Sequence, residues 1–332
     1  MFPAKISKLN FKSKRSISLI IKVSILVLAF SFIFNKLSDN QNLENFRNLV
    51  KNLTSSDVNR VLIAVFLMML LNWFLEAMKW KFLVRSIESI SIWKAIESVF
   101  CGLTLAVFTP NRIGEYGGRV FFLRPKRRVF GVIAMAVGAI GQMIITNVVG
   151  ALALLWFLGT FIPMEPLLYQ IIVLLTTIFC GFFIIFFFNI RWLNDLFKRV
   201  AILKKAEKFL TILSRYKKSD LFRVFLFSFA RFLVFTGQYC LIIKLLIPNL
   251  QVFEMTMMIF ILFFVQSALP SLDLLDVGVR SMTATYFFSY ITDQEIAIMA
   301  ATACVWFVNL IVPAILGSVF VFKLNIFGTD NN

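Results

Sequence analysis

The sequence predicts an all-α polytopic membrane protein with about six transmembrane helices and two opposed re-entrant helical hairpins that form an inverted repeat. Three observations support this fold class. The chain of 332 residues is 60% hydrophobic, whereas soluble domains are about 45–50% apolar. Several apolar runs reach the roughly 20 residues that a bilayer crossing needs. Lys and Arg gather in the short segments between these runs, where they act as topology signals.

Six apolar runs are predicted to span the membrane, at residues 17–34, 58–78, 129–160, 167–188, 220–247 and 294–322. Five basic residues between Lys5 and Arg15 precede the first span, which places the N-terminus in the cytoplasm. The last span runs inward to Lys323, so the C-terminus is expected on the same side. Residues 35–57 are polar and mixed in charge, and they are expected to hold a short amphipathic helix on the outer face.

The apolar segment 91–123 has basic residues at both ends, with Arg85 before it and Lys126 after it. A single span cannot have both ends in the cytoplasm, but a re-entrant hairpin can. Pro110 cannot donate a backbone hydrogen bond, so the first half-helix is expected to end just before it. The second half-helix is expected to begin near Asn111, which is a good N-cap residue.

A second segment repeats this pattern. An apolar half reaches Pro270, a polar middle holds Asp273, Asp276 and Arg280, and another apolar half reaches about Phe288. The stretch SYITDQE that follows has no Lys or Arg, so this hairpin is expected to enter from outside.

The chain is therefore predicted to be one membrane domain, residues 1–332, built from repeat A at about 58–160 and repeat B at about 220–322. A basic cytoplasmic segment, 189–219, joins them. Each repeat has a span, a hairpin and another span in the same order but with opposite direction. Many transporters have such inverted repeats, with the binding site at their broken helices. The basic segment is interpreted as a solvated topology signal, with headgroup docking as the alternative.

Each hairpin carries three charged residues at offsets 0, 3 and 7, namely Arg112, Glu115 and Arg119 in the first and Asp273, Asp276 and Arg280 in the second. On a helix, each triplet lies within about a 60° arc. Glu115 can pair with both neighbouring arginines, and Asp276 with Arg280. The triplets are either internal salt bridges that pin the hairpins or the lining of a polar cavity. A charge at bilayer depth costs at least about 2.5–3.5 kcal/mol, which favours the cavity.

Other polar residues within the spans are secondary candidates for the cavity, and interhelical hydrogen bonding is the default interpretation for each amide. They are Arg231, Gln142, Gln238 and Asn309, with Asn72, Asn147 and Glu76 as weaker positions. Arg231 is expected either to face the cavity or to pair with an acid such as Asp273. Asn309 and Pro313 are expected to kink the last span.

The composition argues against several functions. The chain has no histidine and no Walker A sequence, and its four cysteines show no paired spacing. We therefore expect no metal site, no cofactor and no catalytic triad. The formal charge of +17 is distributed as topology signals, and no nucleic-acid motif is present.

The stretch TPNRIGEYGGR resembles the TPGRxGE…R signature of the lysylphosphatidylglycerol synthase transmembrane-region family, also called the flippase-like domain. LPSLDLLDVGVRS is similar to the second signature of that family, a proline followed by a Gly-rich turn and GVRE. The sequence departs from these patterns at Asn111, where glycine is common, at Asp276, where glycine is usual, and at Ser281, where an acid is usual. The resemblance implies functional roles for Pro110, Arg112, Gly114, Glu115, Arg119, Pro270, Gly278 and Arg280.

The resemblance also implies a function. The chain corresponds to the membrane half of such proteins without the synthase domain, integral to the bacterial cytoplasmic membrane, and it is expected to move a phospholipid or aminoacylated lipid between leaflets. The alternatives are a membrane-embedded transferase that acts on a lipid headgroup and a non-catalytic partner of a lipid-modifying envelope enzyme. The first hairpin has a net charge of +1 and the second of −1, so one site could hold a phosphate and an amine. The lipid, the driving force and the oligomeric state stay open.

Overall fold

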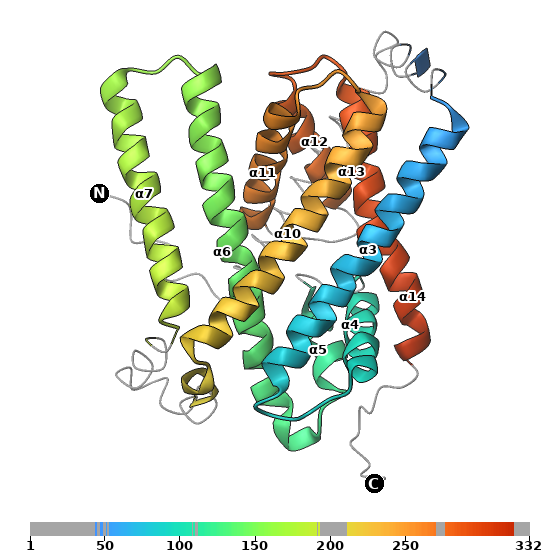
Figure 1. The fold of residues 1–332 in the computed structure, drawn as a ribbon, viewed down its shortest axis with the longest axis vertical. Helices are drawn as coiled ribbons and strands as arrows, with labels where there is room; N and C mark the ends of the chain where they lie inside the picture. The colour runs from blue at the N-terminus through green and yellow to red at the C-terminus, as the bar shows by residue number, and fades with distance from the viewer. Residues whose placement is uncertain are drawn as a thin grey trace, which may run out of the picture.

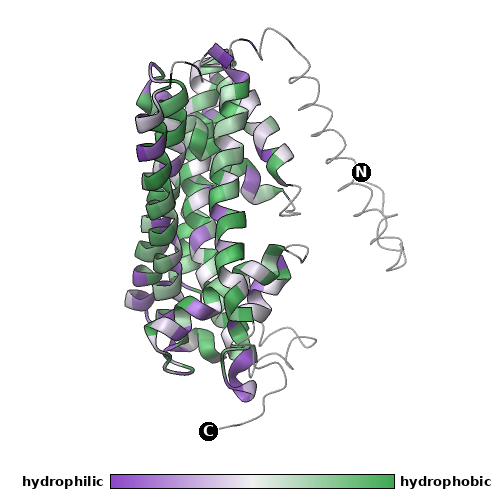
Figure 2. Ribbon diagram, turned by 90° about the vertical axis from the view of Figure 1, so that its right-hand side faces the viewer, coloured by the Kyte–Doolittle hydropathy of each residue, from purple (hydrophilic) through white to green (hydrophobic). Residues whose placement is uncertain are grey.

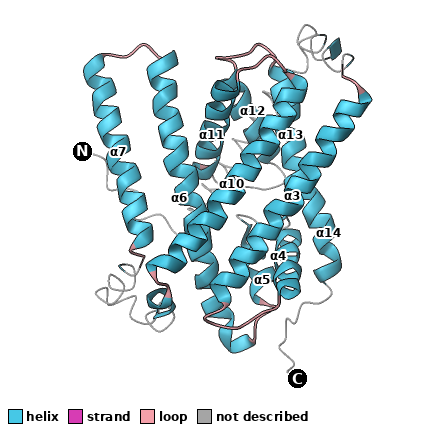
Figure 3. Ribbon diagram, in the orientation of Figure 1, coloured by secondary structure: helices cyan, strands magenta, loops and turns pink. Residues whose placement is uncertain are grey.

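The protein is described by a computed structural model that covers residues 53–107, 109, 112–190, 192, 211–269 and 276–321, with single positions between 44 and 51. These residues form helices joined by loops, and no strand occurs among them (Figure 3). Five long apolar helices have the length and composition to cross a membrane. They are α3 (Ser55–Val84), η3 with α6 (Pro125–Arg127 and Arg128–Phe161), α7 (Pro166–Phe188), α10 (Lys218–Leu246), and α13 with η7 and α14 (Glu295–Trp306, Phe307–Ile311 and Val312–Val321).

These five helices confirm five of the six predicted spans, and their bounds mostly lie within a few residues of the expected ones. The first predicted span, 17–34, and most of the amphipathic helix expected at 35–57 lie outside the described residues. The same holds for most of the basic segment 189–219, of which a short helical turn, η5 (Thr211–Arg215), is described just before α10.

Two pairs of short helices complete the fold. α4 (Ile92–Val107) and α5 (Ile113–Val120) occupy one end of the bundle, and α11 (Val252–Ala268) and α12 (Asp276–Phe288) occupy the other (Figure 1). Both pairs lie on the same side of the long helices, with their inner ends turned toward one another (Figure 2). The order long helix, short pair, long helix occurs twice with opposite direction, which is the predicted inverted arrangement.

The turn of the first pair differs in detail from the expectation. α4 ends at Val107, α5 begins at Ile113, and Arg112 rather than Asn111 is the N-cap of α5. Arg112 has left-handed backbone angles, φ 56° and ψ 28°. Because an arginine side chain cannot cap the helix, Thr109 does so: its Oγ1 accepts a hydrogen bond from the Gly114 N–H at 2.7 Å.

Glycines bring the first pair into close contact. A Cβ atom added at Gly118 on α5 would lie 2.4 Å from the Cα atom of Gly102 on α4. A Cβ at Gly114 would lie 2.2 Å from the carbonyl oxygen of Leu105. α4 also packs against α14, where Thr104 Oγ1 donates to the carbonyl of Ala314 at 2.7 Å. The two helices of the first hairpin are therefore in backbone contact with each other, and a side-chain-to-backbone hydrogen bond joins α4 to α14.

The buried core has two parts, one for each end of the bundle. One part surrounds α3, α4 and the first half of α6, with Trp80, Leu83 and Leu103 fully buried. The other surrounds α10, α11 and α13, with Met258 and Phe288 at its centre. Each short-helix pair is thus packed into its own half-core, and the space between the two halves is where polar residues gather.

α3 extends further than predicted. The sequence places the end of this span at residue 78, just before Lys79, but the helix continues to Val84 and Lys79 is 2% exposed. Beyond this point, Tyr216 donates a hydrogen bond from its hydroxyl to the carbonyl of Leu83 at 2.9 Å. Burial raises the pKa of Tyr216 to about 12, so it stays a neutral donor at physiological pH.

The last long helix contains an irregular turn at the position where its sequence predicts a kink. Residues Phe307–Ile311 form a π-helical turn, in which the N–H of Val312 bonds to the carbonyl of Phe307, five residues earlier. Asn309 lies inside this turn and Pro313 follows it. Such wide turns inside α-helices occur frequently at functional sites.

Candidate functional site: a charged cavity between the two halves

Glu76 is the centre of a buried ion-pair network. This side chain on α3 is 6% exposed. Its Oε1 accepts a hydrogen bond from Arg119 Nη1 on α5 at 2.6 Å. Its Oε2 pairs with Lys79 Nζ at 2.7 Å and also with Nη1 of Arg231 on α10. One carboxylate therefore joins three cations from three helices.

The first charged triplet forms a ladder along α5, as its spacing predicts. Arg112 Nε lies 3.1 Å from Glu115 Oε2, and Arg119 Nη2 pairs with the other oxygen of Glu115. Glu115 pairs with both arginines, which confirms the sequence prediction. Arg119 is 3% exposed and its guanidinium bridges Glu115 to Glu76.

Arg231 borders the cavity and pairs with an acid, which are the two outcomes that the sequence suggested. Asp273 was the candidate acid, and it lies outside the described residues. The described partner is Glu76, and Arg231 Nε also donates to Asn72 Oδ1 at 2.9 Å. The guanidinium carbon lies 5.2 Å from the ring centre of Trp73, within the range of a cation–π contact. Successive turns of α3 thus hold Arg231 in place.

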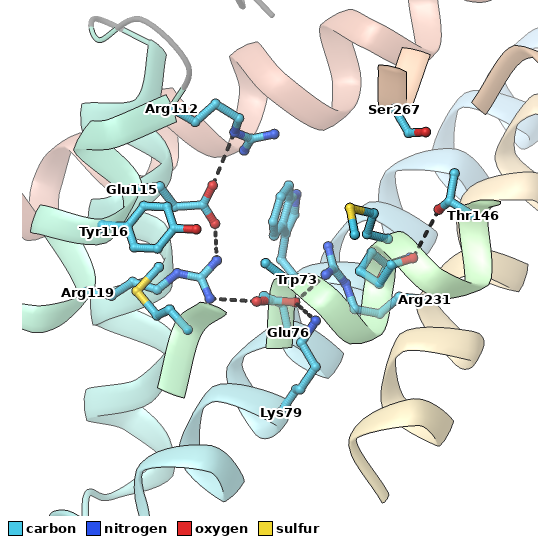
Figure 4. A pocket seen from close by; sticks show the side chains of 14 residues that line it. Trp73, Glu76, Lys79, Arg112, Glu115, Tyr116, Arg119, Thr146, Arg231 and Ser267 are labelled. Carbon is cyan, nitrogen blue, oxygen red and sulfur yellow. Dashed lines mark hydrogen bonds and ion pairs between the residues drawn. The ribbon is translucent and has the colours of Figure 1, made fainter. Parts of the chain in front are cut away.

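These side chains line a charged cavity of about 420 Å³ (Figure 4). Its lining includes Trp73, Glu76, Lys79, Arg112, Glu115, Tyr116, Arg119, Gln142, Thr146, Arg231 and Ser267. Four cationic and two carboxylate side chains border it, which leaves a formal charge of +2 among the described residues. Both carboxylates are already engaged, so the excess positive charge is directed to whatever occupies the cavity.

An adjoining cavity of about 380 Å³ extends toward the second pair of short helices. The two cavities share Trp73, Arg112, Gln142, Thr146, Arg231 and Ser267. The adjoining cavity adds Arg280 of α12, whose Nη1 donates to Gln266 Oε1 on α11 at 2.7 Å. Arg112, the first residue of one triplet, and Arg280, the last residue of the other, therefore border one space. Pro110 and Pro270, which precede α5 and α12 in the chain, lie outside the described residues.

The remaining predicted residues have varied positions. Gln142 and Asn309 line the adjoining cavity. Gln238 is fully buried elsewhere and donates to the carbonyl of Val65 at 3.0 Å, so it serves as an interhelical hydrogen bond. Gly278 lies within α12, which begins at Asp276. The side chain of Asp276 is not among those that the structure describes. The predicted Asp276–Arg280 pair stays a prediction.

The contribution of α3 was not evident from the sequence, in which Glu76 and Asn72 are weaker candidates and Lys79 follows the end of the predicted span. Asn72, Glu76 and Lys79 stand at offsets 0, 4 and 7, so they share one helix face. Offsets of this kind are the signal that could have revealed them, as offsets 0, 3 and 7 did for the hairpin triplets. Within the described part of the chain, no three side chains of the types that bind metal ions lie together.

The comparison with protein families agrees with this arrangement. The family described as "Lysylphosphatidylglycerol synthase TM region" matches residues 19–317. The chain belongs to this family. Comparison with curated proteins gives no match. The match covers the five long helices and both short pairs almost to the end of α14. This member of the lysylphosphatidylglycerol synthase transmembrane-region family is thus an integral membrane protein, and the family indicates a role connected with membrane lipids.

Proposed function

We propose that this protein is a lipid transporter that moves a phospholipid or an aminoacylated lipid between the leaflets of the bacterial cytoplasmic membrane. The observation that carries the proposal is the charged cavity, whose described side chains have a formal excess of two positive charges and which is enclosed by helices that are otherwise apolar. Arg112, at the exposed end of the α5 ladder, has a side chain that is 34% exposed. Its planar guanidinium suits a phosphate, because it can bond two oxygens at once.

The energetic argument favours binding over a purely structural role. Each charge at bilayer depth costs at least about 2.5–3.5 kcal/mol before pairing. Salt bridges that only hold helices together need equal numbers of positive and negative groups. Among the described residues, the network around Glu76 instead has more cations than anions, so an incoming anion would balance it.

The two short pairs supply a route for transport. They enter the bundle from opposite ends, and their arginines Arg112 and Arg280 border the same space. In the proposed membrane orientation the pairs are re-entrant hairpins, with both termini in the cytoplasm. Transporters built from inverted repeats expose a central site alternately by moving one repeat against the other. Because Glu76 links α3, α5 and α10, such a motion would need this network to rearrange.

In this proposal no side chain is catalytic. A general acid or base must be free to exchange its proton with substrate, whereas Glu76 and Glu115 each accept bonds from two or more cations. Membrane lipids are the proposed ligands, and a lipid-modifying enzyme that supplies the lipid is the proposed protein partner.

The test is a reconstitution of the purified chain alone into lipid vesicles. A phospholipid with a fluorescent headgroup is placed in both leaflets, and a membrane-impermeant quencher reports how much reaches the outer leaflet. We expect vesicles with the protein to lose more fluorescence than protein-free vesicles, and Arg112→Ala to abolish the difference. Arg60→Ala is the matched control, because Arg60 pairs with Asp57 at an exposed position outside the cavity. Equal quenching with and without the protein would contradict the proposal.

A further inference from the structure

The adjoining cavity contains a buried hydrogen-bond acceptor that no described residue satisfies. Asn309 is 7% exposed and lines this cavity, and within the described part of the chain its Oδ1 has no hydrogen-bond partner. Its Nδ2 donates to the carbonyl of Val305 at 3.0 Å. This bond determines the orientation of the amide, because the reversed amide would place two oxygen atoms against each other. Oδ1 must therefore lie on the side away from Val305.

The π-helical turn explains why an asparagine is held in this way. In the turn Phe307–Ile311 the backbone bonds run five residues back rather than four. A carbonyl at such a turn can lose its usual backbone donor, and the side chain of Asn309 supplies one to Val305. The irregular turn and the amide thus form one local unit, which holds an oxygen at the cavity wall.

An unpartnered buried acceptor costs about 1–3 kcal/mol. The protein carries this cost beside a space with room for a ligand. Gln142, on α6, adds to the lining of the same cavity a second acceptor, Oε1, for which the described residues supply no donor. The cations Arg112, Arg231 and Arg280 border this space as well. The lining therefore combines anion-binding groups with acceptors that only a donor can satisfy.

We propose that Asn309 is a specificity-determining residue that accepts a hydrogen bond from the headgroup of the transported lipid. This inference rests on the proposed function and deepens it. The phosphodiester binds the arginines, and a hydroxyl or ammonium group beyond it donates to Asn309 Oδ1. A headgroup with a phosphodiester but without such a donor leaves the oxygen unpaired and binds more weakly. The shared chemistry is an O–H or N–H donor at the end of an anionic or zwitterionic headgroup.

Two pairs of lipids separate the two sources of donor. Phosphatidylethanolamine and phosphatidylcholine differ in whether the ammonium carries hydrogen atoms or methyl groups. Phosphatidylglycerol and phosphatidylmethanol differ in whether the phosphodiester carries hydroxyl groups. Each lipid competes with a fluorescent phospholipid for the purified protein in detergent micelles. The affinity ratio within each pair is the readout, and it is insensitive to a partial loss of folded protein.

For the natural protein we expect the donor-bearing lipid to bind about tenfold more tightly in at least one pair. Asn309→Leu should reduce that ratio to about one by weakening the donor-bearing lipid alone. Asn309→Thr should lower the ratio while preserving the backbone bond, because a threonine hydroxyl can donate to the carbonyl four residues earlier, as Thr283 does to Val279 at 2.8 Å. The hydroxyl oxygen can still accept, but it lies one bond closer to the backbone than Asn309 Oδ1 and therefore further from the headgroup. The Thr variant carries the test if the Leu variant does not fold.

Gln238→Leu is the matched control. Gln238 is also a buried amide whose nitrogen donates to a carbonyl and whose oxygen meets no donor in the described part of the chain, but it lines neither cavity. Its replacement should leave the affinity ratios unchanged. Equal affinities within both pairs for the natural protein, or ratios unchanged in both Asn309 variants, would overturn the inference. Arg112→Ala should weaken all four lipids alike, so failure of the phosphate site is distinguished from failure of the Asn309 site.

Discussion

Arg119 on α5 and Glu76 on α3 are 43 positions apart in the chain, yet Arg119 Nη1 lies 2.6 Å from Glu76 Oε1. This contact joins the first hairpin to the long helix that precedes it. Through the second oxygen of Glu76 it reaches Arg231 on α10, which belongs to the other repeat. The two halves of the protein therefore meet at the carboxylate of Glu76.

Replacement of Arg112 should separate the contribution of charge from that of shape. Arg112→Lys keeps the charge but loses the planar fork, so we expect slower lipid movement in the vesicle assay. Arg112→Ala loses both and should be slower still. Thermal unfolding of the purified variants checks that they fold. Lipid movement at the natural rate in folded Arg112→Ala protein would show that the site is assigned to the wrong residue.

Glu76→Gln should destabilise the protein strongly. Removal of the carboxylate leaves Lys79, Arg119 and Arg231 close together with much of their compensation lost. Breaking a buried pair in this way costs about 3–5 kcal/mol, so the thermal midpoint in detergent should fall clearly. Asp57→Asn breaks an exposed pair as a control and should cost less than about 1 kcal/mol. Equal midpoints for the two variants would argue against the central role of Glu76.

Gly118→Ala should separate α5 from α4. The added Cβ would lie 2.4 Å from the Gly102 Cα atom, so the helices must move apart, and overpacking of this kind costs about 1–3 kcal/mol. Gly181→Ala on α7 is the control, because a Cβ there meets no atom within 4 Å. We expect a lower unfolding temperature for the first variant and an unchanged or slightly higher one for the second. The opposite order would mean that the hairpin is packed differently.

Asp276→Asn tests whether the site is polarised. The second hairpin carries two acids and one arginine in its triplet, so we expect it to lie near the amine of the headgroup. The variant should slow the movement of amine-bearing lipids more than that of purely anionic lipids. Rates for both classes are measured in the same vesicles. An equal decrease for both classes would contradict the expectation that the site is polarised, but it would not contradict the transporter proposal.

The membrane orientation can be checked by labelling single cysteines introduced into a cysteine-free protein. We expect cysteines at Lys94 and Lys126 to be labelled from the cytoplasmic side and one at Ser289 from the outside. These positions flank the first and second short-helix pairs. Labelling of positions 94 and 126 from opposite sides would rule out a re-entrant first hairpin.

The sequence by itself determined the long helices, the two interrupted segments and the family. These features depend on local properties: hydropathy over about 20 residues, the missing N–H of proline, and charge spacing along one helix face. The same spacing correctly predicted that Glu115 pairs with Arg112 and Arg119, because all three lie within two turns of one helix.

Only the tertiary structure decided which groups meet between helices. Glu76 and Lys79 stand near the end of an apolar run, where hydropathy cannot separate a buried pair from a cytoplasmic flank. Arg231 is 155 positions away from Glu76, and its partner depends on how α3 and α10 cross. Likewise, Asn309 and Gln238 are both amides within apolar runs, and each has an oxygen that no described residue satisfies. Only helix packing places one at the cavity wall and the other in the core.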